Sequence, residues 1–167
     1  MLIIQNGYEC DYEMKLFYKL YFDMNEDIYV YSNFEYKDKV INVYTEIIYN
    51  GDTYFDDFYY DFDTENQKAQ FIKKIFTASC TKSFCHAAEK IKHINLPWGV
   101  MCGIRPAKIV RELMEEGHSD SEVVEILKKI MLIEDEQGGK VYGKRLTLHI
   151  RLQRMKRFCL TKSEKIQ

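Results

Sequence analysis

The sequence predicts an α+β fold, in which a small and mainly antiparallel sheet is packed by a long helix and followed by a helical C-terminal half. Apolar residues alternate with more polar ones over residues 28–62, whereas they recur at three- and four-residue spacing on both sides of this stretch. Of the 24 aromatic residues, 18 fall within the first 62 positions. Aromatic residues are enriched in strands, so this distribution favours a sheet in the N-terminal part. A length of 167 residues suits one domain, or one domain with a small appendage.

The N-terminal part is expected to hold one strand and one helix. Residues 1–5 form a short apolar run of strand type, which Asn6 and Gly7 close as a turn signal. Over residues 12–22 the apolar side chains recur as they would on one face of a helix, namely Met14, Phe17, Leu20 and Tyr21.

The alternating stretch predicts three strands that form an antiparallel meander with one solvated face. The side chains that share the core face are Ile28, Val30, Phe34 and Tyr36, then Ile41, Val43, Ile47 and Tyr49, and finally Tyr54, Phe58, Tyr60 and Phe62. Asn50 and Gly51 join the last two strands as a tight hairpin, because both residues accept positive φ. Tyrosine suits such strands, since its ring can pack on the core while its hydroxyl reaches water.

The rest of the chain is expected to be helical. Residues 65–92 form a long helix that packs across the sheet, and residues 93–105 form a structured loop. Pro106 opens a helix over residues 106–116, which Gly117 closes, and Ser119 caps the helix that follows over residues 122–131. We therefore interpret residues 1–139 as one domain, with a sheet part at 1–62 and a helical part at 63–139, and residues 140–167 as a basic amphipathic helical tail.

The net charge of −2 hides a strong asymmetry along the chain. Residues 1–66 have a net charge of −11, residues 67–139 of +1 and residues 140–167 of +8. An acidic sheet beside a basic helix explains this pattern, and a basic arm for nucleic acid is the alternative.

A stand-alone RNA-binding or protein-interaction module is the runner-up function. It would use the basic cluster Arg151, Arg154, Lys156, Arg157 and Lys162, with the aromatic sheet stacking bases. The aspartates of the sheet region would repel a phosphate backbone, which makes nucleic acid the less favoured partner; they are Asp52, Asp56, Asp57, Asp61 and Asp63.

The chain shows no membrane or export signal. No window approaches the roughly 20 apolar residues of a membrane-spanning helix, and the N-terminus lacks a basic region followed by an apolar one. A cytoplasmic location is the expectation.

Residues 95–110, NLPWGVMCGIRPAKIV, are the most specific segment of the sequence. They resemble the pattern LPWG-x-x-x-G-I/V-R-P-x-K in the N-terminal region of coproporphyrinogen dehydrogenase-like proteins, a branch of the oxygen-independent coproporphyrinogen III oxidase family that precedes its radical-SAM core with an extra domain. The matching residues are Leu96, Pro97, Trp98, Gly99, Gly103, Ile104, Arg105, Pro106 and Lys108.

The resemblance implies a role in heme (porphyrin) biosynthesis, in a family of oxidoreductases. In full-length relatives it implies a core whose Cys-x3-Cys-x2-Cys motif binds a [4Fe–4S] cluster and cleaves S-adenosylmethionine, and this motif is missing here, with Cys159 standing alone. We expect an accessory domain without its catalytic core, with no cofactor and no activity of its own. Its partner would be that core, in cis or in trans, or a porphyrinogen substrate; a homodimer through the face left bare by the core is a further option.

The same segment holds the candidate binding residues. Arg105, Pro106 and Lys108 stand where a loop enters a helix, so free backbone N–H groups and two cations could meet an anion such as a porphyrinogen carboxylate. Trp98, Gly99 and Gly103 complete the set. The structural alternative is that Arg105 caps a neighbouring helix or pairs with a carboxylate, while Trp98 fills the core.

Metal binding and nucleophilic catalysis have weaker support. Cys80, Cys85, His86 and His93 contain ligand types, but the two cysteines point about 140° apart on a helix and no CxxC pair exists. Small core residues are the expected identity of Cys80 and Cys85. Cys102 is the most reactive-looking thiol, yet no base is identifiable beside it.

Overall fold

The computed structural model describes residues 2–23, 25–94, 96, 100, 106–115 and 117–131. The chain divides into two compact units, Met1–Cys102 and Gly103–Gln167. The expected basic tail, with Cys159, lies outside the described residues.

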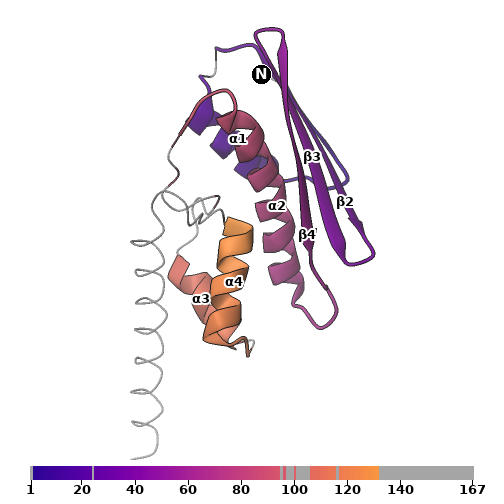
Figure 1. Ribbon diagram of the computed structural model, residues 1–167, viewed down its shortest axis with the longest axis vertical. Helices are drawn as coiled ribbons and strands as arrows, with labels where there is room; N and C mark the ends of the chain where they lie inside the picture. The colour runs from indigo at the N-terminus through magenta and orange to yellow at the C-terminus, as the bar shows by residue number, and fades with distance from the viewer. Residues whose placement is uncertain are drawn as a thin grey trace, which may run out of the picture. The chain divides into compact units, whose positions relative to one another are not determined.

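The first unit contains the sheet and two helices, which confirms the α+β class (Figure 1). Along the chain the elements are β1 (Leu2–Asn6), α1 (Asp11–Tyr21), β2 (Ile28–Lys37), β3 (Val40–Tyr49), β4 (Asp52–Asp61) and α2 (Ala69–Glu89). The strands lie in the order β1-β2-β3-β4. β1 runs parallel to β2, and the other two pairs are antiparallel.

Two tight turns build the meander. Asn50 and Gly51 have φ values of 53° and 89°, so the predicted hairpin between β3 and β4 is confirmed. Asp38 and Lys39, between β2 and β3, also have positive φ, 53° and 64°. The sequence does not reveal this second turn, because neither residue is glycine.

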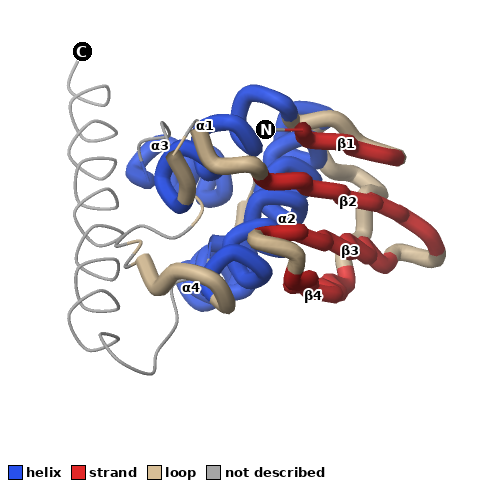
Figure 2. Tube along the Cα trace, turned by 90° about the horizontal axis from the view of Figure 1, so that it is seen from above, coloured by secondary structure: helices blue, strands red, loops and turns tan. Residues whose placement is uncertain are grey.

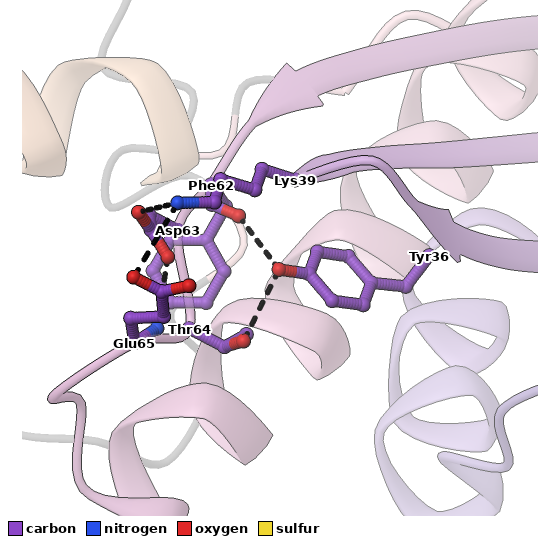
Figure 3. A network of polar contacts seen from close by, with 6 residues as sticks. All are labelled: Tyr36, Lys39, Phe62, Asp63, Thr64 and Glu65. Carbon is purple, nitrogen blue, oxygen red and sulfur yellow. Dashed lines mark hydrogen bonds and ion pairs between the residues drawn. The ribbon is translucent and has the colours of Figure 1, made fainter.

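A polar network fastens the turn between β2 and β3 to the segment after β4 (Figure 3). The Lys39 Nζ atom lies 2.6 Å from Asp63 Oδ2. The Tyr36 hydroxyl donates a hydrogen bond to the Phe62 carbonyl oxygen over 3.1 Å and lies 3.2 Å from Thr64 Oγ1. The end of β4 is therefore held beside the β2–β3 turn.

The core lies between the sheet and the helices α1 and α2, which pack on the same face of it (Figure 2). The strands β2 and β3 bury alternate side chains, as their period of two predicts. The largest fully buried side chains of this unit are Tyr18, Phe17, Phe84, Met14, Ile28, Ile41, Ile47, Ile75 and Val30. Burial of this aromatic and aliphatic surface is the main force that holds helices and sheet together.

The long helix α2 begins later than the sequence predicts. Asn66 has a φ of 62°, and Lys68 is extended with a ψ of 137°. Neither conformation belongs to a right-handed helix, so α2 starts only at Ala69. It ends at Glu89, close to the expected position.

The second unit has two described helices, α3 (Pro106–Glu115) and α4 (Asp120–Met131). Gly117, with a φ of 97°, ends α3: its N–H donates to the Met114 carbonyl, and the His118 N–H donates to the Leu113 carbonyl. At the start of α4 the Ser119 N–H donates to Glu122 Oε2 over 2.7 Å, while the Glu122 N–H donates to Ser119 Oγ over 3.3 Å. The predicted stop and capping box are both confirmed.

Among the described helices, none combines the length and the apolar character that crossing a bilayer requires.

Candidate functional site

The predicted binding segment falls mostly outside the described residues. Trp98, Gly99, Gly103 and Arg105 all lie there, and so does Cys102. Pro106 is the first residue of α3, as the sequence predicts, and Lys108 lies in the same first turn. The backbone N–H groups that a helix leaves unpaired at its start are therefore located directly after Arg105 in the chain.

The cysteines on α2 are core residues, as predicted. Cys80 and Cys85 are both buried, and so is Cys10 just before α1. A hydrogen bond with the Cys10 thiol, together with burial, raises the pKa of the Cys80 thiol. Because the thiolate is the nucleophile and the metal ligand, this environment suits packing better than chemistry.

Cys10 is itself held by β1. Its backbone N–H donates to Gln5 Oε1 over 2.8 Å, and its thiol donates to the same oxygen over 3.3 Å. The contact between Cys10 and Cys80 is not visible in the sequence, since 70 positions separate the two residues. Within the described ranges, no three His, Cys, Asp or Glu side chains form a group able to hold a metal ion.

A polar row crosses the inner face of the sheet in register. Gln5 of β1 pairs with Ser32 of β2, Ser32 with Thr45 of β3, and Thr45 with Asp56 of β4. Ser32 and Thr45 are buried. Among the described residues no group bonds to Thr45 Oγ1 or to Asp56 Oδ2, both of which are buried.

Helix α2 places polar side chains against this row. The Ser83 hydroxyl donates to the Val43 carbonyl of β3 over 3.2 Å. His86 Nδ1 lies 3.5 Å from Asp56 Oδ1, and these side chains are only 26% and 16% exposed. His86 therefore contacts strand β4 through Asp56. The row could have been found from the sequence, because Ser32, Thr45 and Asp56 occupy inward positions of the alternating pattern.

The opposite, outer face of the sheet carries exposed aromatic and aliphatic side chains. Of the seven large apolar residues that are exposed in the described part of the chain, five belong to this face: Leu2, Ile4, Tyr29, Phe55 and Tyr59. The rings of Tyr44 and Phe55 stack, with 6.2 Å between their centroids. Most of the exposed large apolar side chains in the described part of the chain therefore lie on this face.

Carboxylates stand between these rings. Glu35, Glu46, Asp57 and Asp61 share the outer face by strand register. The Tyr44 hydroxyl donates to Glu46 Oε2, and the Tyr59 hydroxyl donates to Asp57 Oδ2, each over 2.9 Å. These hydrogen bonds raise the pKa of both tyrosines.

The five aspartates that the sequence analysis took together do not form one surface. Asp57 and Asp61 point outward, whereas Asp56 faces α2 and His86. The reason is the strand period of two, which sends neighbours in sequence to opposite faces.

No family model matches the chain, and no curated protein or solved structure matches it either.

Proposed function

We propose that this chain is an accessory domain of a coproporphyrinogen dehydrogenase-like protein, and that it helps to present an acidic porphyrinogen to a radical-SAM core. The observation that carries the proposal is the segment at residues 95–110, with its LPWG motif followed by Gly103, Ile104, Arg105, Pro106 and Lys108. The structure has the α+β class that the sequence predicts.

Physical chemistry supports an anion-binding role for this segment. Pro106 opens α3, so the unpaired N–H groups and the positive end of the helix dipole belong to the same few residues as Arg105 and Lys108. A coproporphyrinogen carries four propionate carboxylates, and a carboxylate is the type of group that a helix start with adjacent cations stabilises.

The radical chemistry would take place in the radical-SAM core and not in the accessory domain. In this family the cluster and S-adenosylmethionine supply the radical for oxidative decarboxylation, and both belong to the core. The described cysteines of this chain, Cys10, Cys80 and Cys85, pack in the protein interior and are not proposed as ligands.

The RNA-binding alternative gains no support from the sheet. A phosphate backbone that approached the exposed rings would meet Glu35, Glu46, Asp57 and Asp61 on the same face. We therefore keep the accessory role as the one proposed function.

The test is a titration of the full chain with coproporphyrinogen III under anaerobic conditions, using isothermal calorimetry. Arg105→Ala is expected to weaken binding about tenfold, because it removes one charged hydrogen-bond donor. Arg111→Ala is the matched control, since Arg111 lies on α3, which begins directly after Arg105 in the chain, is exposed and pairs only loosely with Glu115 at 3.9 Å. Equal affinity of the two variants would contradict the role of Arg105, and absence of binding to the unaltered chain would contradict the proposal.

A further inference from the structure

The outer face of the sheet combines two properties, an apolar character and an acidic one. It is apolar, with Phe55 55% and Tyr59 59% exposed. It is also acidic, because Glu35, Glu46, Asp57 and Asp61 project from the same side of β2, β3 and β4 and outnumber the lysine of these strands on that side, Lys37. Within the first unit, α1 and α2 lie against the other face of the sheet and leave this one open among the described residues (Figure 2).

The chemistry of the face selects its partner. A second copy of the same face would bring carboxylates against carboxylates, and a nucleic acid or an anionic lipid surface would be repelled for the same reason. A cationic side chain with a long apolar stem satisfies both properties, since its stem covers the rings while its charge meets the carboxylates. Arginine fits best, because its planar guanidinium stacks on aromatic rings and pairs with carboxylates through two hydrogen bonds.

The chain itself supplies an example of this contact. Lys90, at the end of α2, reaches the edge strand β4, where its ammonium group donates a hydrogen bond to the Phe55 carbonyl oxygen. The same Nζ atom lies 5.3 Å from the centroid of the Phe55 ring. A cation is thus already accommodated at the rim of the face, in the cation–π geometry that a partner would use further in.

The hydrogen bonds on the face hold its carboxylates in place. The Tyr44 hydroxyl bonds to one carboxylate oxygen of Glu46, and the Tyr59 hydroxyl bonds to one carboxylate oxygen of Asp57. Each carboxylate has a second oxygen that could accept a hydrogen bond from a partner. A side chain that is already oriented loses less conformational entropy when it binds.

We propose that the outer face of the sheet is a docking surface for an arginine-rich segment of a partner protein, with Glu46 and Asp57 as its charged anchors and Phe55 and Tyr59 as its ring contacts. This inference is independent of the porphyrinogen proposal, because none of residues 95–108 takes part in it. The negative net charge of −11 over residues 1–66 would steer such a partner toward this part of the chain.

The test uses the full chain and nona-arginine as the probe, with the affinity read from fluorescence anisotropy and the site read from amide NMR shifts. Glu46→Gln with Asp57→Asn is expected to weaken binding about fivefold, as two exposed ion pairs are lost. Glu9→Gln with Asp27→Asn removes the same charge from exposed positions outside the face and is expected to change the affinity less than twofold.

A second pair of variants tests the aromatic rings. This pair still decides the question if the charge variant does not fold. Tyr59→Ser is expected to weaken binding about threefold, whereas Tyr12→Ser, which removes a ring that is 74% exposed on α1, leaves it unchanged. The shifted amides should belong to β3 and β4. Equal losses within the charge pair would show attraction to net charge alone. Equal losses within the tyrosine pair, or shifts centred on α1, would show that the rings of the outer face are not the contact. Either result would overturn the proposal.

Discussion

The Nζ atom of Lys92 lies 2.7 Å from Oε1 of Glu26, and this ion pair ties the end of α2 to the connection between α1 and β2. The ammonium group also lies over two rings, 5.2 Å from the centroid of Phe22 and 5.7 Å from that of Tyr49. Both charged side chains are partly buried, 36% and 21% exposed. The pair therefore closes the end of the core where helix, loop and sheet meet.

This pair predicts a loss of stability at acid pH. The hydrogen bond from Lys92, and a second one from the Asp23 N–H, lower the pKa of Glu26. A carboxyl whose pKa is lower in the folded state stabilises the fold above its unfolded-state pKa of about 4.3, and this contribution is lost as the pH falls through the folded-state value. Glu26→Gln should cost about 1 kcal/mol at pH 7 and almost nothing at about pH 2.

Urea unfolding of the two proteins at both pH values measures this difference. Glu9→Gln, at an exposed position in the β1–α1 connection, is the control and should leave the free energy of unfolding unchanged at either pH. A cost for Glu26→Gln that persists at low pH would show that the effect is not ionic.

Gly7 is predicted to be irreplaceable by alanine. It has a φ of 82°, and a Cβ atom there would lie 2.0 Å from the Phe34 carbonyl oxygen, which is backbone and cannot move aside. Gly51 has a similar φ of 89°, but a Cβ atom there meets nothing within 4 Å. Gly7→Ala should lower the free energy of unfolding by about 3 kcal/mol or more, and Gly51→Ala should lower it by about 1 kcal/mol. The shift of the midpoint of chemical unfolding measures both changes. Similar costs for the two variants would mean that φ alone matters and that the close approach does not.

Thr45 and Ser83 should respond in opposite directions when their hydroxyls are removed. Thr45 is fully buried and its Oγ1 has no hydrogen-bond partner among the described residues, so Thr45→Val replaces a polar group by a methyl group of the same shape. We expect a gain of about 1 kcal/mol. Ser83→Ala removes the bond to the Val43 carbonyl and should cost about 1 kcal/mol. Thermal unfolding of both variants checks the signs, and destabilisation by Thr45→Val would show that the hydroxyl is satisfied in solution.

Local features of the fold were predictable because their causes are local. The inward positions of Val30 and Val43 follow from the period of the strand, the turn at Asn50 and Gly51 from residues that accept positive φ, and the end of α3 from Gly117. Each of these signals lies within a few residues of the structure that it specifies.

Contacts between distant segments were not predictable. The pairs Cys10 with Cys80, Asp56 with His86 and Glu26 with Lys92 depend on how α2 and the residues after it lie against the sheet and against the segments on either side of α1, which sequence periodicity does not define. Asp56 is acidic, yet the strand period turns it toward α2. Most of the candidate binding segment lies outside the described residues. Within them, the structure confirms the prediction that Pro106 begins α3.

The most direct test of the accessory role compares coproporphyrinogen III with its tetramethyl ester as ligands of the full chain in anaerobic calorimetry. The ester has the same macrocycle without the four charges, so binding through carboxylates predicts saturable uptake of one free-acid molecule per chain and at least about tenfold weaker uptake of the ester. Equal affinity for the two ligands, or heat of dilution alone with the free acid, would contradict the account.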